Sequence, residues 1–265
     1  MSAAPPPPAG PAATPPGRLL LVPNALDLGA DPVDLGDVLP LGVLRAAARL
    51  RCWAAENAKT TRAFLKRVDA VVPLARPLQD IEVRELPRAP KGGRAAGVDA
   101  EPWQQLLRPA LHGEDVGLIS EAGLPAVADP GSALVDAAHR LGLTVLPLAG
   151  PSALLLALAA SGLNGQSFAF VGYLPQDDAA RAARLRELES RSRREAQTQI
   201  AIETPYRNDA LLQALLHQLA PGTRLSVATA LTLPGGWCRT ATVQAWRRDP
   251  PQLDRHRPAV FLFLA

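Results

Sequence analysis

The chain has few aromatic residues, few lysines and few cysteines. Aromatic side chains make up 4% of its 265 residues, so aliphatic and alanine side chains must fill the core. Nearly all of the basic charge is arginine, since lysine occurs only at Lys59, Lys66 and Lys91. The formal net charge is +3 and no dense basic stripe accompanies it. This composition permits contact with nucleic acid but does not argue for it.

The two cysteines, Cys52 and Cys238, lie far apart in the sequence. This usage is typical of a reducing compartment and argues against a disulfide framework. Neither cysteine has a Cys or His neighbour at metal-ligand spacing, and the four histidines are scattered, so we expect no metal site. The N-terminus lacks a basic start followed by an apolar core, as a secretory signal would require. We therefore expect a cytoplasmic protein.

One stretch without charge, residues 143–164, is long enough to resemble a membrane span. Pro147, Gly150, Pro151 and Ser152 interrupt it in the middle. A strand, a turn and a helix explain this pattern better than one continuous helix. We therefore expect no contact with a membrane.

Three motifs of common enzyme classes are absent. No Gly-x-Gly-x-x-Gly follows the first expected strand, and no phosphate-binding loop with Lys-Ser/Thr occurs. There is also no Gly-x-Ser-x-Gly nucleophile elbow. The sequence therefore disfavours three enzyme classes: hydride-transferring dehydrogenases, nucleotide hydrolases and serine hydrolases.

Short apolar segments alternate with amphipathic helical patterns along most of the chain. This alternation predicts an α/β protein with a parallel sheet and helical crossovers. The pattern changes after Gly165, which indicates a second α/β domain of about a hundred residues. We predict a disordered Pro/Ala tail over residues 1–17, an N-terminal α/β domain over 18–163 and a C-terminal α/β domain over 164–265.

The most informative segment is Ser120–Gly131, which reads Ser-Glu-Ala-Gly-Leu-Pro-Ala-Val-Ala-Asp-Pro-Gly after an apolar strand. Glu121 places a carboxylate at the strand's carboxyl end, and Gly123 allows a ligand to approach the backbone closely. Asp129 and Pro130 fit the N-cap and the first position of a helix. Ligands bind at such strand ends in open α/β sheets. An ordinary capped connection is equally consistent with these residues.

A second turn, Gly150–Ala153, follows the next strand and opens another helix. Backbone N–H groups at a helix start attract a carboxylate or a phosphate, and Ser152 adds a hydroxyl. Two such turns after successive parallel strands favour a small-molecule site over two unrelated caps.

A third, weaker signal is the segment Glu203–Asn208, which reads Glu-Thr-Pro-Tyr-Arg-Asn. Here a strand ends at Glu203 and Pro205 initiates a helix. We expect Tyr206 and Arg207 to be exposed near its start. A capped helix with a solvated arginine explains the pattern equally well.

These motifs together resemble the tetrapyrrole methylase superfamily. Ser120–Gly131, the Pro-Leu-Ala-Gly-Pro-Ser-Ala run at 147–153 and Phe-Val-Gly-Tyr-Leu-Pro at 170–175 carry the resemblance. The closest branch is the ribosomal RNA small subunit methyltransferase I type, which methylates a ribose 2′-oxygen of 16S rRNA. Ala-Ala-Glu-Asn at 54–57 and Glu-Thr-Pro-Tyr-Arg at 203–207 resemble further motifs of that branch. The resemblance runs from about Leu19 to Leu264.

The resemblance implies two α/β domains with S-adenosylmethionine in the cleft between them, and a homodimer. It also implies RNA, as 16S rRNA or the 30S subunit, as the partner. Glu56, Glu121 and Glu203 are the candidate catalytic carboxylates. The residues expected near the cofactor are Pro23, Glu121, Ala122, Gly123, Leu124, Pro125, Gly150, Ser152, Ala153, Tyr173, Ala230 and Pro258.

Two segments depart from the branch's pattern. Pro-Asn-Ala-Leu-Asp-Leu-Gly at 23–29 replaces Pro-Thr-Pro-Ile-Gly-Asn-Leu, and Asn-Ala-Lys at 57–59 replaces Asp-Thr-Arg. The acceptor is therefore open: a tetrapyrrole or another small molecule is one alternative, and a cofactor-binding protein without catalysis is another. Lys59, Arg62 and Arg207 are candidates for phosphate contacts, although a solvated or ion-paired role is equally consistent.

Overall fold

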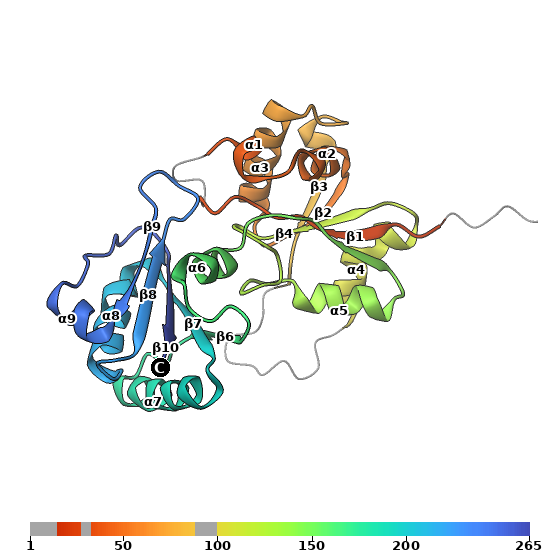
Figure 1. Ribbon diagram of the computed structural model, residues 1–265. Coiled ribbons are helices and arrows are strands. Elements are labelled where there is room, and N and C mark those ends of the chain that lie inside the picture. Colours follow the sequence, from red (N-terminus) through yellow and green to blue (C-terminus); the bar gives the residue numbers. More distant parts are fainter. Residues whose placement is uncertain (1–14, 28–32, 88–99) are drawn as a thin grey trace, which may run out of the picture. The chain divides into compact units, whose positions relative to one another are not determined.

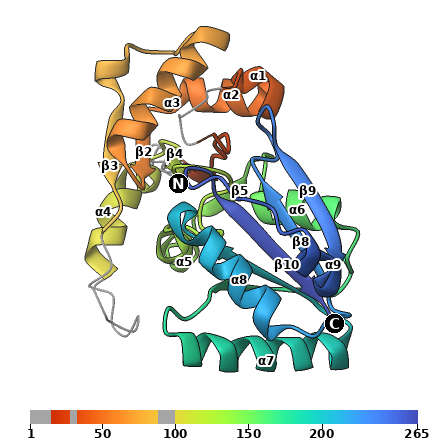
Figure 2. The ribbon, with the colours of Figure 1, turned by 90° about the vertical axis from the view of Figure 1, so that its left-hand side faces the viewer.

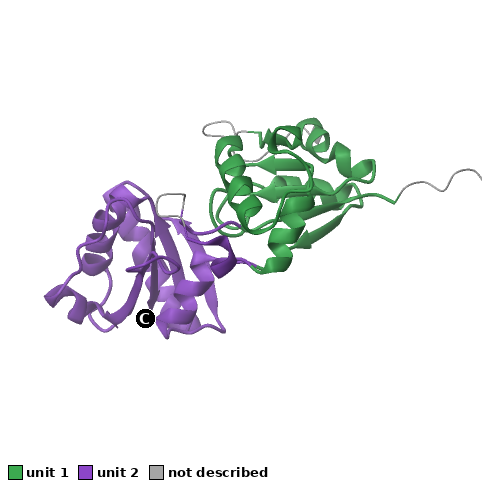
Figure 3. Ribbon diagram, turned by 90° about the horizontal axis from the view of Figure 1, so that it is seen from above, with its two compact units in different colours: residues 1–23, 40–149 green, residues 24–39, 150–265 purple. Residues whose placement is uncertain are grey.

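The computed structural model describes residues 15–27, 33–87 and 100–265 (Figure 1). By its contacts the chain divides into two compact units (Figure 3). Unit 1 comprises residues 1–23 and 40–149, and unit 2 comprises residues 24–39 and 150–265.

Unit 1 is built on a sheet of five short parallel strands in the order β3-β2-β4-β1-β5. The strands are β1 (Arg18–Leu21), β2 (Cys52–Ala55), β3 (Glu82–Glu85), β4 (Val116–Ile119) and β5 (Thr144–Pro147). Because all five run the same way, their carboxyl ends lie at one edge of the sheet and their amino ends at the other.

Four helices connect these strands and cover the two faces of the sheet: α2 (Leu41–Arg49), α3 (Ala58–Val71), α4 (Ala100–Leu111) and α5 (Ser132–Arg140). Helices α2 and α3 contact each other, as do α4 and α5. On one face the ring of Trp53 meets Phe64 of α3, at 6.3 Å between centroids. On the other face the neighbouring side chains Cys52 and Ala54 join the core that α4 and α5 cover.

Unit 2 is built on a mixed sheet in the order β6-β7-β10-β8-β9, in which only β6 and β7 are parallel. The strands are β6 (Phe168–Tyr173), β7 (Thr198–Glu203), β8 (Arg224–Thr229), β9 (Trp237–Thr242) and β10 (Ala259–Leu264). Helices α7 (Asp178–Glu195), α8 (Asn208–Gln218) and α9 (Val243–Arg248) share one apolar core with the sheet. Helix α6 (Ala153–Ser161) packs against other sheet residues, Ile200, Ala228, Val260 and Leu262 (Figures 1 and 2).

The structure bears out the α/β class and most of the expected strands and helices. Among the labelled helices and strands, three short ones were not expected: α1 (Leu35–Val38), α9 and β3. The units also divide differently from the predicted boundary after residue 163. Helix α6 belongs with unit 2, because Leu154, Ala157 and Leu158 pack on the second sheet.

Most of the predicted tail, residues 1–14, lies outside the described residues. Its last residue, Gly17, donates its N–H to the carbonyl of Ala110 at 2.8 Å. A side chain at Gly17 would meet the carbonyl oxygen of Glu114 at 2.2 Å, so this position packs directly on unit 1. Among the described helices, none is both long and apolar enough to cross a membrane.

Gly236 in unit 2 lies so close to another backbone segment that no side chain fits there. A Cβ at this position would lie 1.9 Å from the carbonyl oxygen of Ala230. We expect Gly236→Ala to lower the free energy of unfolding by about 1–3 kcal/mol, because backbone must move to accommodate the methyl group. Gly222→Ala is the matched control, since a Cβ there meets nothing within 4 Å. Denaturant unfolding measures the stability of both variants. An equal loss in Gly236→Ala and Gly222→Ala would contradict this prediction.

Candidate active site

The carboxyl edge of the unit 1 sheet gathers three of the predicted segments. Glu56 follows β2, Glu121 follows β4 and Pro23 follows β1, and these strands are neighbours. The chain leaves β1 toward β2 on one side, whereas it leaves β4 toward β5 on the other. Strands β4 and β1 therefore form the topological switch point, where open α/β sheets bind their ligands.

Hydrogen bonds tie these loops together. The Glu121 N–H donates to Glu56 Oε2 at 3.0 Å. The backbone of Glu56 donates in turn to the Ile119 carbonyl at 3.1 Å, and Val22 donates to the Leu118 carbonyl at 2.8 Å. The carboxylate of Glu56 thus holds the start of the turn after β4.

The turn after β4 has an unusually curled backbone. Gly123, Ala126 and Ala128 have φ values of +67°, +64° and +64°, in the left-handed region. An alanine in this region costs roughly 1–2 kcal/mol, so two of them store strain here. Strained backbone of this kind concentrates at ligand clamps and active sites.

The expected N-cap at Asp129 is wrong. Helix α5 begins at Ser132 and its N-cap is Gly131, whose φ of +129° suits only glycine. A Cβ at Gly131 would also lie 2.9 Å from a methyl group of Leu118. The chain therefore needs two more residues than the cap pattern predicts before the helix can start.

Asp129 instead joins the carboxylates of Glu56 and Glu121. Burial first, and then the charges of Glu56 and Glu121, together raise the pKa of Asp129 to about 6. The cap pattern hides this role, although a second carboxylate in the same turn as Glu121 is a signal for it. A carboxyl with this pKa exchanges its proton near neutral pH.

One edge of the unit 2 sheet gathers the other predicted residues. Tyr173 ends β6, Glu203 ends β7 and Ala230 follows β8. Pro258 precedes β10, which runs antiparallel, so it lies at the same edge: Ala259 pairs with both Glu203 and Thr229. Thr229 Oγ1 donates to the Pro258 carbonyl at 2.9 Å.

The start of α6 lies at this edge as well. At the far end of the helix, the carbonyl of Ser161 accepts from Thr240 Oγ1 at 2.7 Å, and that of Gly162 accepts from Arg224 at 3.1 Å. Arg224 begins β8, so the first residues of α6 point toward the end of β8. Ala153 and Leu231 both border the apolar cluster that α6 forms with the sheet.

The turn opens a helix, as expected, and Ser152 is the N-cap of α6, but its side chain makes no capping hydrogen bond. The first N–H groups of the helix are therefore available to a ligand at this end. Ser152 is itself buried, with 8% of its surface exposed, whereas Tyr173 at the same edge is 59% exposed. Gly150 lies in the segment that leads into α6.

Glu203 and Arg207 form an ion pair, with 3.2 Å between Oε2 and Nη2. The other carboxylate oxygen of Glu203 accepts the N–H of Thr204 at 2.8 Å. The Glu203 side chain is 5% exposed and that of Arg207 is 22% exposed. The expectation that Arg207 is exposed is therefore wrong, whereas Tyr206 is exposed at 72%.

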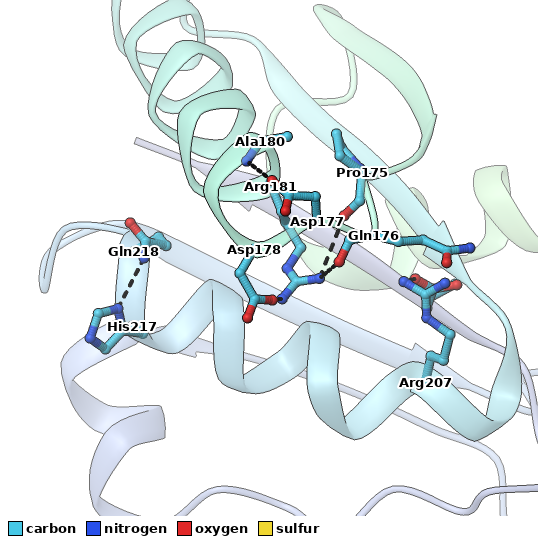
Figure 4. A network of polar contacts seen from close by, with 10 residues as sticks. Pro175, Gln176, Asp177, Asp178, Ala180, Arg181, Arg207, His217 and Gln218 are labelled. Carbon is cyan, nitrogen blue, oxygen red and sulfur yellow. Dashed lines mark hydrogen bonds and ion pairs between the residues drawn. The ribbon is translucent and has the colours of Figure 1, made fainter.

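The segment after β6 is held by α7. Arg181 donates to the carbonyls of Pro175 and Gln176, at 3.5 and 3.0 Å, and pairs with Asp178 (Figure 4). Asp177 caps the helix by accepting the N–H of Ala180 at 2.8 Å. These contacts fix the loop that follows Tyr173.

The altered Asn57 has a local structural role. Its side chain caps α3 by accepting the N–H groups of Lys59 and Thr60, at 2.9 and 3.3 Å. Lys59 is exposed, and Arg62 contacts the carbonyl of Leu78 at 3.4 Å. Within the described residues, no group of three or more His, Cys, Asp or Glu side chains is arranged to hold a metal ion.

Replacing Asp129 should stabilise the protein in a pH-dependent way. Because the pKa of Asp129 is raised to about 6 from 3.8, its contribution to stability is full below pH 4 and is lost as the pH rises through 6. Its partial exposure reduces the loss to about 1–2 kcal/mol. We therefore expect Asp129→Asn to gain this much at pH 8 and almost nothing at pH 4.

Denaturant unfolding at both pH values measures this difference. Asp136→Asn is the control, because Asp136 is an exposed carboxylate on α5 that pairs with Arg140. If Asp129→Asn raises the free energy of unfolding equally at pH 4 and pH 8, the raised pKa of Asp129 is not the cause of the gain.

The chain matches known proteins over most of its length. The sequence model of the Tetrapyrrole (Corrin/Porphyrin) Methylases matches residues 43–244. The protein named Ribosomal RNA small subunit methyltransferase I from Vibrio cholerae is 40% identical over 129 residues, which cover 49% of this chain and 43% of that protein. The protein of the same name from Mycobacterium tuberculosis is 31% identical over 220 residues, covering 82% of this chain and 67% of that protein. The matched part spans about half the length of several of these relatives.

The fold also resembles solved structures. The crystal structure of the methyltransferase CobJ superposes with a TM-score of 0.55 at 19% identity, covering 94% of each chain. This likeness shows the fold alone. With three quarters of its length matched by the family's sequence model, the chain belongs to the Tetrapyrrole (Corrin/Porphyrin) Methylases.

Proposed function

We propose that this protein is an S-adenosylmethionine-dependent methyltransferase that acts on RNA, with a ribose 2′-hydroxyl of 16S rRNA as the acceptor. The observation that carries the methyltransferase activity is the curled turn at Glu121–Pro125, which stands at the switch point of a parallel sheet in a member of a methylase family. The names of the relatives support the choice of RNA. Such an acceptor implies a cytoplasmic location.

The residues at the two sheet edges suit the chemistry of this cofactor. The start of α6 offers backbone N–H groups that Ser152 does not cap, and these suit the carboxylate of the methionine moiety. The carbonyls of the turn around Gly123 suit a positively charged sulfonium. At the edge of the unit 1 sheet we also assign Pro23 to the cofactor, and at the edge of the unit 2 sheet Tyr173, Ala230 and Pro258. When bound, S-adenosylmethionine supplies an electrophilic methyl group.

The chain's own contribution is to position the acceptor and exclude water, because methyl transfer requires an in-line approach of the nucleophile. The carboxylates divide into two roles. Glu56 holds the turn through the Glu121 N–H, and Glu203 is engaged by Arg207 and Thr204. We assign both as positioning residues. Asp129, with a pKa of about 6, is the group suited to take the proton of the acceptor hydroxyl, beside Glu121.

Two measurements test this function. Calorimetry with S-adenosylmethionine tests cofactor binding, and transfer of a labelled methyl group to 16S rRNA or 30S subunits from cells lacking the protein tests the acceptor. We expect binding, and label in a ribose of the rRNA. Binding without label in the rRNA would contradict the RNA acceptor. Label in a tetrapyrrole would then assign a small-molecule acceptor, and no label in either would leave a cofactor-binding protein without catalysis.

The turn glycine gives the sharpest site-directed test. Gly123→Val adds a branched side chain to the turn, and we expect at least about a tenfold loss of S-adenosylmethionine affinity. Gly142→Val is the matched control, because Gly142 has a similar φ of +70° but follows α5 at the amino edge of the same sheet. Both variants carry similar backbone strain, but Gly123 is buried whereas Gly142 is exposed, so Gly123→Val should lose more thermal stability. Cofactor affinities are therefore compared at a temperature where both variants are folded. Equal cofactor affinity in the two folded variants would exclude the turn from the binding site.

A homodimer is part of the same proposal. Phe168 and Phe170 are exposed at 42% and 38%, although the chain has only five phenylalanines. They lie on the edge strand β6, and Phe170 pairs with Ile200, which faces α6. On α6, Leu155 and Leu156 are exposed as well. Exposed apolar groups at a sheet edge are typical of an interaction surface.

We expect Phe168→Glu to convert a dimer into a monomer, because it places a charge in this apolar surface. Light scattering after size-exclusion chromatography measures the mass of both forms. The exposed Val127→Glu variant of unit 1 is the control and should leave the mass unchanged. A wild-type protein that is monomeric at micromolar concentration would contradict the dimer.

A further inference from the structure

A groove at the amino edge of the unit 1 sheet stands apart from the candidate active site. Its volume is about 570 Å³. Arg18 opens β1, and Glu114 and Asp115 precede β4, so the groove begins at the edge opposite Glu56 and Glu121. Its lining residues are Arg18, Leu20, Ala46, Arg49, Leu50, Arg51, Arg76, Glu114, Asp115, Leu146 and Leu148. We call it the arginine groove.

The two carboxylates of the groove are already neutralised. Arg18 pairs with Asp115 at 2.6 Å, and Arg51 pairs with Glu114 at 3.0 Å. The bond from Arg18 is the main cause of the lowered pKa of Asp115, which therefore stays charged at neutral pH. Of the four arginines, Arg49 and Arg76 make no ion pair among the described residues, although the charge of Arg49 also helps to lower the pKa of Asp115.

Arg76 is the more telling of these two arginines. Its Nε is buried and has no hydrogen-bond partner among the described residues. A buried donor on a charged group is costly to leave unsatisfied, so an anion that reaches this nitrogen would be stabilised. Arg49 is the last residue of α2, where a positive charge also favours the helix dipole. The helix dipole does not account for Arg76, which lies beyond the end of α3.

The rest of the lining is apolar. Leu20 and Leu146 are paired neighbours on β1 and β5, and Leu148 follows β5. Leu146 is 36% exposed, so the groove presents hydrocarbon beside its arginines. Its volume lies in the range of roughly 300–1,000 Å³ that is typical of sites for small molecules and cofactors. A ligand with phosphate groups and flat apolar faces, such as a nucleotide unit, matches this lining.

The positive surface continues beyond the groove. A second hollow of about 410 Å³ shares Arg51 and Glu114 with it and adds Glu82, Arg84, Arg108 and His112. Arg84 pairs with Glu82 at 2.5 Å, so Arg108 is the arginine that this hollow adds without an ion pair among the described residues. Two adjoining hollows with arginines along both suit a phosphate backbone better than a single small anion. Arginine is also the residue that pairs with phosphate in a bidentate manner and stacks on bases.

We propose that the arginine groove binds the phosphate backbone of the RNA acceptor, away from the site of methyl transfer. This inference rests on the proposed RNA methyltransferase function. The strands of unit 1 have four residues each, so the two edges of the sheet are separated by roughly 13 Å. A folded ribosomal RNA extends much farther than that, so one RNA can contact both edges.

The double variant Arg49→Gln/Arg76→Gln tests the groove, because it removes the two unpaired charges and keeps polar side chains of similar length. Binding of a 16S rRNA fragment is measured by fluorescence anisotropy at several salt concentrations. We expect the Kd for RNA to rise at least about tenfold and the slope of its logarithm against the logarithm of salt to fall by about two, one for each lost phosphate contact. The KM for RNA should rise, while kcat and the affinity for S-adenosylmethionine stay unchanged.

Arg140→Gln/Arg248→Gln is the control with the same change in charge. Arg140 is an exposed residue of α5 and Arg248 an exposed residue of α9, and neither lines the groove. We expect less than half the change in salt slope for this control. Thermal unfolding of both double variants checks that they are folded.

The outcomes separate the groove from the proposed function. A wild-type protein that methylates RNA, together with a groove variant of normal RNA affinity and salt slope, would overturn the groove alone. A wild-type protein that binds S-adenosylmethionine but neither binds nor methylates RNA would overturn the RNA acceptor, and the groove with it.

Discussion

The contact between the Glu56 carboxylate and the Glu121 N–H organises the candidate active site. It joins the loops after two neighbouring parallel strands, β2 and β4, and so fixes the start of the curled turn. Without an anchor of this kind, a turn with two alanines in the left-handed region would relax toward a less strained path. The same contact brings Glu56 and Glu121 close to Asp129, whose pKa their charges help to raise. One hydrogen bond therefore links the shape of the turn to its protonation chemistry.

In unit 2 the candidate residues lie at one edge of a mixed sheet and not of a parallel one. Its sheet is mixed, so the edge holds the ends of β6, β7 and β8 but the beginning of β10. Ala230 turns the chain here with a φ of +51°, and Gly236 packs directly against its carbonyl oxygen. Both units thus place left-handed backbone where the resemblance predicts the methyl donor. In unit 1 it lies after β4, and in unit 2 it lies after β8.

Local patterns in the sequence predicted the strands and helices well, because apolar runs and glycine turns mark them clearly. The same patterns could not predict which sheet α6 covers. Its sequence is apolar on nearly every side, so only the packing of Leu154, Ala157 and Leu158 on the second sheet decides the matter. Asp129 was misassigned for a related reason. The cap pattern depends only on the neighbouring Asp-Pro-Gly residues, whereas Glu56 is far away in the sequence and comes near Asp129 only in the fold. Arg207 was expected in solvent, because the local pattern does not show that Glu203, at the end of β7, forms an ion pair with it.

Hydrogen–deuterium exchange with and without S-adenosylmethionine tests the central claim most directly, because it reports on the backbone N–H groups of the two segments assigned to the cofactor. The account predicts slower exchange in the turn at 121–125 and at the start of α6, residues 153–155, at saturating cofactor. Binding shown by calorimetry together with unchanged exchange in both segments would contradict it.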